Sequence, residues 1–178
     1  MHNQTEYIKK DAMRTTPYFC IVGRSKSGKT TVMELLIKCL VKRGFRVGAI
    51  KHTSKDFEFD KKGKDSYRHR KAGASVVALS SPKRIAIFKD LDSGFFLNEI
   101  VEKYMEDVDL VIVEGYKESP SLKIEVIGNL TREAPLFKDD DKIIAIISDR
   151  DFDVKIPLFR FNEIDKITDF IIERLLPK

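Results

Sequence analysis

The sequence has only two cysteines in its 178 residues, and features that would mark a secreted or membrane-spanning chain are missing. Cys20 and Cys39 stand in apolar surroundings without a Cys-x-x-Cys pattern, so reduced, buried thiols are a better interpretation than a disulfide or metal site. The sequence contains no run of about 18 apolar residues, the length that a helix needs to span a bilayer. Residues 1–16 are polar and contain no hydrophobic signal region, which favours a cytoplasmic protein without a membrane partner.

The residues that are present are typical of one ordinary globular domain. Hydrophobic residues make up 42% of the chain and charged residues 34%, enough for a sizeable core. The net charge of +5 permits binding of phosphates or nucleotides but does not require nucleic acid. Because no repeat, low-complexity tract or linker interrupts the pattern, residues 17–178 are predicted to form a single domain after a polar lead-in at residues 1–16.

Short apolar runs alternate with helical patterns along the chain. Buried strands are predicted at Tyr18–Val22, Phe45–Lys51, Leu110–Val113, Leu122–Ile127 and Lys142–Ser148. Helical spacing predicts a helix that stops at Gly44, one within Phe95–Asp107 and a last one that Asn162 can cap. The β-type runs at residues 75–79 and 84–88 indicate a hairpin or two neighbouring strands. This alternation predicts an α/β fold, with a mostly parallel sheet covered on both faces and an added hairpin.

The segment GRSKSGKT, Gly23–Thr30, matches the P-loop pattern Gly-x-x-x-x-Gly-Lys-[Ser/Thr] between a predicted strand and a predicted helix. Its glycines let the backbone wrap closely around phosphate oxygens, and the following helix adds the positive end of its dipole. Lys29 is expected to contact the β- and γ-phosphates, and the Thr30 hydroxyl to bind Mg²⁺. The predicted nucleotide-binding residues here are Gly23, Arg24, Ser25, Lys26, Ser27, Gly28, Lys29, Thr30 and Thr31.

An acidic residue, Glu114, directly follows the predicted strand Leu110–Val113. Ligands of open α/β sheets gather at the carboxyl ends of the strands, so Glu114 is predicted to face Mg²⁺ or a water bound to it. A plain exposed acid at a strand end is the alternative. Lys29, Thr30 and Glu114 are therefore the candidate catalytic residues, and no strong general base accompanies them, which predicts slow hydrolysis.

Three segments together resemble one known family: Gly23–Thr31, Lys51–Ala74 and Val111–Lys117. They are similar to the molybdopterin-guanine dinucleotide biosynthesis adapter proteins of the MobB type, GTP-binding members of the P-loop class. The resemblance runs from about Tyr18 to the C-terminal helix and implies the three-layer P-loop NTPase fold. It also implies a cytoplasmic homodimer that binds GTP and Mg²⁺, hydrolyses GTP weakly and assists the guanylyltransferase that joins GMP to molybdopterin.

The same resemblance bears on the polar region from Lys51 to Lys71, which contains eight basic and four acidic residues. A run of this kind is usually a solvated helix start with weak local ion pairs. The family match instead indicates contact with an anionic ligand, either a phosphate or molybdopterin as the molybdenum cofactor. The candidate contacts are Lys51, His52, Lys64, Asp65, Ser66 and Arg68. Asp60, which precedes the Gly-Lys-Asp-Ser segment, is a candidate for holding the outer waters of the metal.

The resemblance also points to Asp149, which follows the apolar run Lys142–Ser148, as a residue near the nucleotide. A carboxylate can accept hydrogen bonds from N1–H and the 2-amino group of guanine, whereas adenine offers no such pair. Asp149 is therefore a candidate reader of the base, with an ordinary loop-capping aspartate as the alternative.

Two other function classes stay open beside the GTP-binding adapter of molybdenum cofactor maturation. A P-loop small-molecule kinase or ATP-dependent ligase would use the basic loop to hold an acidic substrate. Such an enzyme needs a base that activates the acceptor, and often a lid, and neither is evident. A nucleic-acid protein is disfavoured because the basic residues cluster in one loop with few stacking aromatics. Homodimer formation follows from the resemblance and from the hairpin, whose edge could pair between chains.

Overall fold

The computed structural model describes residues 15–55, 57, 60–91, 94–130, 135–138 and 140–176. Most of the polar lead-in predicted for residues 1–16 lies outside the described residues. The contacts of the chain group into two compact units, one drawn from Met1–His52 with Leu97–Lys178 and one from Thr53–Phe96. Whether residues 17–178 fold as a single domain stays a prediction.

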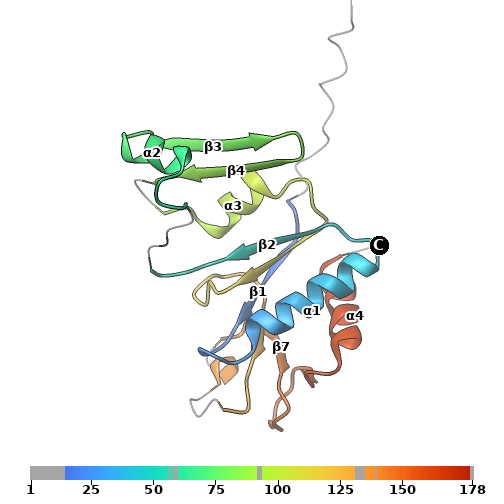
Figure 1. Ribbon diagram of the computed structural model, residues 1–178. Helices are drawn as coiled ribbons and strands as arrows, with labels where there is room; N and C mark the ends of the chain where they lie inside the picture. The colour runs from blue at the N-terminus through green and yellow to red at the C-terminus, as the bar shows by residue number, and fades with distance from the viewer. Residues whose placement is uncertain are drawn as a thin grey trace, which may run out of the picture. The chain divides into compact units, whose positions relative to one another are not determined.

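The first unit is built on a parallel sheet of six strands in the order β2-β5-β1-β6-β7-β8 (Figure 1). The strands are β1 (Tyr18–Val22), β2 (Val47–Lys51), β5 (Leu110–Glu114), β6 (Lys123–Val126), β7 (Ile143–Ile147) and β8 (Leu158–Phe159). Parallel strands end at the same edge of a sheet, so the segments after β1, β2, β5 and β7 gather at one edge.

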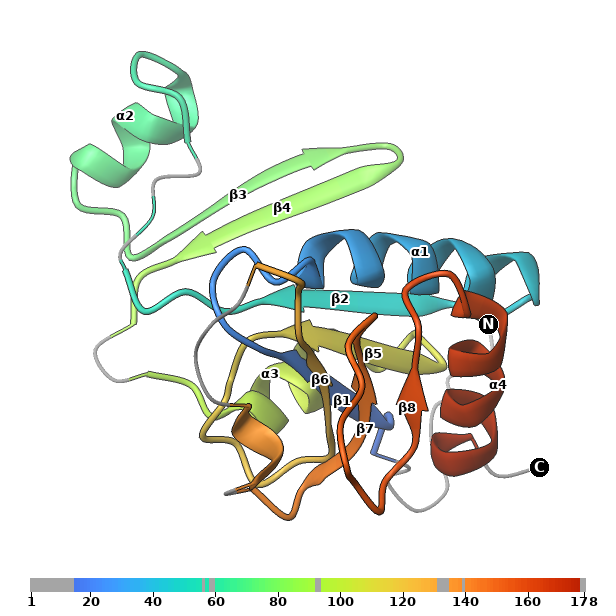
Figure 2. The ribbon, with the colours of Figure 1, turned by 90° about the horizontal axis from the view of Figure 1, so that it is seen from below.

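Helices cover both faces of this sheet (Figure 2). α1 (Lys29–Lys42) and α4 (Ile164–Leu175) pack on one face, and α3 (Leu97–Tyr104) packs on the other. Successive strand residues point to opposite faces. Ile21 accordingly belongs to the core under α1 and α4, whereas Cys20 packs with α3. The predicted three-layer fold is confirmed, and within the described residues no helix is long and apolar enough to cross a membrane.

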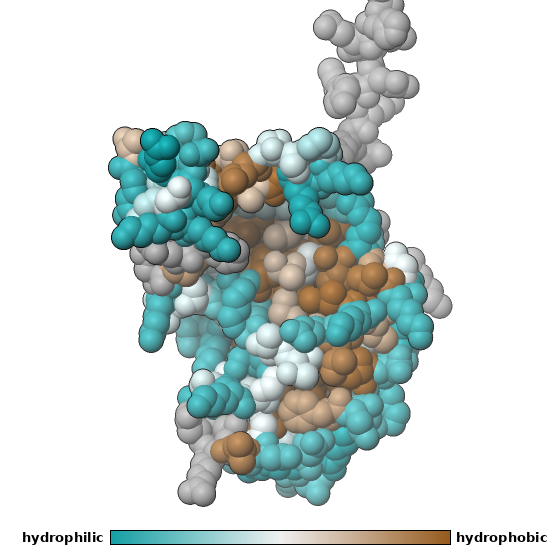
Figure 3. All heavy atoms as spheres, in the orientation of Figure 1, coloured by the Kyte–Doolittle hydropathy of each residue, from teal (hydrophilic) through white to brown (hydrophobic). Residues whose placement is uncertain are grey.

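The second unit contains a short helix and a hairpin. α2 (Asp65–Lys71) is followed by the antiparallel strands β3 (Val76–Ser81) and β4 (Arg84–Lys89), as predicted. The hairpin buries little of its apolar surface, because among its described residues only Val77 is buried. Its exposed large apolar residues are Val76, Leu79, Ile85 and Ile87. Figure 3 shows hydrophobic residues among hydrophilic ones over β3 and β4.

Two local predictions need correction. Cys20 is fully buried as expected, but Cys39 is only partly buried, and its thiol donates a hydrogen bond to Asp165 Oδ1 at 3.2 Å. The N-cap of α4 is Glu163 instead of Asn162, because Asn162 belongs to the turn that the Glu163 N–H closes onto Arg160 O. Two short elements, β8 and the 3-10 helix η1 (Leu136–Lys138), were not predicted.

Candidate functional site

The loop between β1 and α1 has the backbone shape that phosphate binding requires. Gly23 and Gly28 have positive φ angles of 144° and 97°, and Lys26 has a φ of 57°. Gly28 is the N-cap of α1, where no side chain caps the helix and no acidic residue occupies the first turn. The amides of this turn and the positive end of the helix dipole therefore suit an anion, because no cap competes for the amides.

The loop packs tightly against the segments at the end of β6. A Cβ atom on Gly23 would lie 2.3 Å from Val126 O and 2.9 Å from Ser27 Oγ. A Cβ atom on Gly128 would lie 3.0 Å from Ser27 Cα and O. Glycine is thus required at Gly23 and leaves the close approach at Gly128 possible, and the motif indicated only the first of these positions. Ser27 is buried, whereas Ser25, Lys26, Thr30 and Thr31 are exposed.

Lys29 folds its side chain back over the loop. Its ammonium donates to Arg24 O at 2.5 Å and to Ser27 Oγ at 3.4 Å. Burial lowers the pKa of Lys29; the charge of Glu114 opposes this effect, and the charges of Lys117 and Lys51 add to it. A partly buried ammonium gains free energy when an anion joins it. Lys29 therefore suits a phosphate that replaces its contact with the loop carbonyl.

Thr30, Lys51 and Glu114 meet at the carboxyl edge of the sheet. The Thr30 hydroxyl lies 3.2 Å from both carboxylate oxygens of Glu114, and the ammonium of Lys51 forms an ion pair with Glu114 Oε1. Glu114 is 5% exposed, so the alternative of a plain exposed acid is wrong. Hydroxyl and carboxylate oxygens are ligands that Mg²⁺ accepts, and one or two protein groups suffice beside waters and phosphates. The donor set fits Mg²⁺, although the described residues hold no cluster of three or more His, Cys, Asp or Glu side chains.

His52 is packed against an aromatic ring, a contact that sequence reasoning missed. Its ring centroid lies 4.1 Å from that of Tyr116, with an angle of 33° between the planes. Tyr116 follows Gly115, whose φ of 106° brings the backbone so close that an added Cβ would lie 3.1 Å from His52 Cβ. The Gly-Tyr pair directly after Glu114 was a visible signal of such a turn. It places the His52 ring beside the segment that follows Glu114.

Asp149 stands just beyond the end of β7. Oδ1 of Asp149 accepts a hydrogen bond from the Phe161 N–H at 3.3 Å, and the residue is exposed. The preceding Ser148 is fully buried and donates to Ile127 O at 2.8 Å. The ring of Phe161 lies against the P-loop, 3.2 Å from a Cβ placed on Gly28. Phe161 thus links Asp149 to the P-loop. This position suits both alternatives for Asp149, recognition of the base and capping of a loop.

The other candidate residues for an anionic ligand lie in the second unit. Lys64 is the N-cap of α2, and Ser66 is buried with its hydroxyl donating to Asp60 Oδ1 at 2.9 Å. Arg68 and Asp65 form an exposed ion pair at 3.6 Å, the local pairing expected of a solvated helix start. Their meeting with the P-loop stays a prediction, as does the metal role of Asp60.

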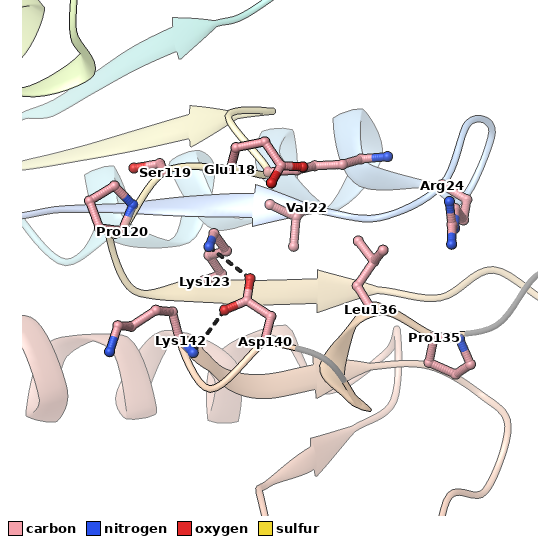
Figure 4. Close-up of a pocket in the computed structure, with 11 residues that line it drawn as sticks. Val22, Arg24, Glu118, Ser119, Pro120, Lys123, Pro135, Leu136, Asp140 and Lys142 are labelled. Carbon is pink, nitrogen blue, oxygen red and sulfur yellow. Dashed lines mark hydrogen bonds and ion pairs between the residues drawn. The ribbon is translucent and has the colours of Figure 1, made fainter.

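A cleft of about 420 Å³ lies beside the loop, over β1 and β6 (Figure 4). Arg24 lines one end, and Lys123 and Asp140, which form an ion pair of 2.7 Å, are also among the lining residues. Glu125 lies two residues after Lys123 on β6 and is 1% exposed. Its carboxylate accepts hydrogen bonds from the N–H groups of Leu136 and Phe137 at 2.8 and 2.9 Å. Burial raises the pKa of Glu125 despite these hydrogen bonds.

Fold and loop together define a class: this is a P-loop protein, with a parallel α/β sheet and the P-loop motif between its first strand and α1. The family model of molybdopterin guanine dinucleotide synthesis protein B matches residues 18–149, and the chain belongs to this family.

The chain is 36% identical to the molybdopterin-guanine dinucleotide biosynthesis adapter protein of Haemophilus influenzae over 87% of each chain. It is 34% identical to the adapter protein of Escherichia coli, covering 88% of this chain and 92% of that protein. A crystal structure of molybdopterin-guanine biosynthesis protein B superposes with a TM-score of 0.71 at 30% identity, over 88% of this chain and 97% of the other. The resemblance inferred from the three motif segments is thereby confirmed.

Proposed function

We propose that this protein binds GTP with Mg²⁺, hydrolyses it slowly and acts as an adapter in molybdopterin guanine dinucleotide biosynthesis. The observation that carries the proposal is the glycine-dependent loop Gly23–Thr30, whose last residue lies 3.2 Å from the buried carboxylate of Glu114. A phosphate site beside a divalent-metal site is what a nucleoside triphosphate needs. The adapter role comes from the names of the related proteins, which share most of their length with this chain.

Phosphate binding rests on loop amides that are in position before the ligand arrives and on Lys29, which exchanges one partner for another. The amides of the loop and of the first turn of α1 surround the phosphates, and Lys29 gives up its contact with Arg24 O to bind the β- and γ-phosphates. These donors stabilise the negative charge that develops on the transferring group. Because no strong general base is evident, hydrolysis stays slow, which suits a protein that acts mainly by binding.

Mg²⁺ would be held by the Thr30 hydroxyl, with Glu114 as a direct ligand or as the acceptor of a metal-bound water. The bound ion would neutralise phosphate charge; the chain contributes the oriented hydroxyl and the buried carboxylate.

Glu114→Gln keeps the shape of the side chain and removes its charge. The gain in GTP affinity that Mg²⁺ provides should therefore fall by about tenfold in this variant. Titration calorimetry with and without Mg²⁺ measures this gain, with the exposed Glu118→Gln as control. An unchanged gain in Glu114→Gln would contradict the assignment.

Base recognition is assigned to Asp149, whose position near Phe161 and the P-loop supports it. GTP should bind at least about tenfold more tightly than ATP, because adenine leaves the carboxylate unpaired. Asp149→Ala should weaken GTP binding and leave ATP binding unchanged, while Asp153→Ala, at an exposed position four residues later, changes neither. Parallel titrations with the two nucleotides check this. If ATP is preferred by the wild type, a kinase or ligase function replaces the proposed one.

The partner of the adapter is the guanylyltransferase of molybdenum cofactor maturation, and the protein works as a cytoplasmic homodimer. The exposed apolar residues of the hairpin support dimer formation, since they leave a surface that a second copy can cover. Light scattering of the purified chain reports its mass, and a monomer would argue against this assembly. Lys64, the N-cap of α2, and Arg68, on α2 together with Asp65 and the buried Ser66, would receive the phosphate of molybdopterin as the molybdenum cofactor. Lys51 and His52, at the end of β2 in the first unit, are the remaining candidates for an anionic ligand.

A further inference from the structure

Lys51 and Glu114 end two neighbouring strands in the same register. β2 pairs in parallel with β5, and Lys51 lies opposite Glu114 in that ladder. The Lys51 side chain is 62% exposed, whereas the Glu114 side chain is 7% exposed. A buried carboxylate without a partner is costly, so the ion pair with Lys51 and the hydrogen bond from Thr30 balance its charge.

This ion pair occupies the carboxylate that the proposed metal site also needs. Two cations on one carboxylate repel each other, and the repulsion is strong where water is scarce. Glu114 is fixed by its strand and its burial, but Lys51 is long, exposed and able to rotate about four side-chain bonds. Lys51 is therefore the group that moves aside when Mg²⁺ arrives together with a nucleotide.

The new position of Lys51 follows from the groups around Glu114. The carboxylate that pairs with Lys51 also accepts the hydroxyl of Thr30, the last residue of the P-loop, at 3.2 Å, so the Lys51 ammonium lies beside this loop. Once a metal ion takes its place on Glu114, Lys51 needs another anion. The terminal phosphate of a nucleoside triphosphate brings negative charge to this edge of the sheet, whereas a diphosphate ends one phosphate earlier.

We propose that Lys51 binds the terminal phosphate of a nucleoside triphosphate, and that it exchanges Glu114 for this phosphate when Mg²⁺ and the nucleotide bind. The inference rests on the proposed function insofar as the P-loop binds a nucleotide. In this role Lys51 distinguishes a triphosphate from a diphosphate. It also supplies, from the chain itself, a positive charge of the kind that an arginine provides in other P-loop proteins.

The first test compares GTP and GDP binding in the presence of Mg²⁺ by titration calorimetry, using the full chain. Lys51→Ala should bind GTP about tenfold more weakly than the wild type, because one charge-assisted contact is lost, and GDP within about twofold. Lys42→Ala, which removes an exposed charge from the last turn of α1, should change neither affinity. Equal weakening of GTP and GDP, or no weakening of GTP, would overturn the proposal.

The second test concerns the exchange itself and uses Mg²⁺ alone. Because Lys51 competes for Glu114, Lys51→Ala should bind Mg²⁺ more tightly than the wild type without nucleotide, and Lys42→Ala should not. Equal or weaker Mg²⁺ binding by Lys51→Ala overturns the exchange. Repeating the first test with ATP and ADP tests the choice of base separately from the role of Lys51. If only adenine nucleotides show the Lys51 effect, the GTP assignment fails and the inference about Lys51 stands. A wild type that binds no nucleotide refutes both.

Discussion

Replacing Lys29 by alanine should weaken the binding of GTP·Mg²⁺ by at least about a hundredfold. The side chain is expected to contact two phosphates, and each charge-assisted hydrogen bond contributes about 1.5–3 kcal/mol, so losing both costs at least about two powers of ten in affinity. Titration calorimetry measures the loss directly. The effect should be larger than that of any exposed lysine, because Lys29 is partly buried next to the loop amides while surface charges are screened by solvent.

The matched control for this prediction is Lys38→Ala, which removes an exposed lysine from the same helix. It should leave affinity unchanged. Without nucleotide, the free energy of unfolding of Lys29→Ala should lie within about 1 kcal/mol of the wild-type value. The lost hydrogen bond to Arg24 O is offset by the removal of a partly buried charge. Unaltered GTP affinity in Lys29→Ala would show that the phosphates bind elsewhere.

The sequence predicted those parts of the fold that carry a strong local pattern. The five-residue run of β1, the apolar spacing of α1 and the run of β5 were all long enough to be recognised. β8 has two residues, so no periodicity could reveal it, and it forms only because β7 offers an edge to pair with. The wrong cap at Asn162 has a similar cause, since the preceding turn decides which residue starts α4.

The residues of the candidate site that belong to a motif could be predicted from the sequence. The contacts that depend on the order of the strands in the sheet could not. The P-loop pattern identified Lys29 and Thr30, and an acid at a strand end identified Glu114. The ion pair between Lys51 and Glu114 depends on β2 lying next to β5, although α2, β3, β4 and α3 separate them in the chain. The cleft beside the loop was not predicted, because it forms between β6 and segments that are distant in the chain, such as those of Arg24 and Asp140.

Gly23→Ala is expected to have the largest effect on stability. Its φ of 144° is unfavourable for a residue with a side chain, and the new methyl group would lie 2.3 Å from Val126 O. The backbone oxygen cannot rotate away, so the loop or the end of β6 must shift. Strain and overpacking together should lower the free energy of unfolding by about 3 kcal/mol or more. Denaturant unfolding followed by circular dichroism measures this loss.

Gly44→Ala separates the two contributions to this loss. Gly44 has a φ of 91°, but a Cβ atom there would meet no atom of the described residues within 4 Å. This variant therefore carries only the conformational cost of a positive φ, about 1 kcal/mol, and should bind GTP as the wild type does. Gly23→Ala should lose nucleotide binding as well as stability, because the shift that relieves its clash also displaces the amides that face the phosphates. Equal losses of stability in the two variants would mean that the contact with Val126 O is relieved without cost, and that the loop does not depend on its packing against β6.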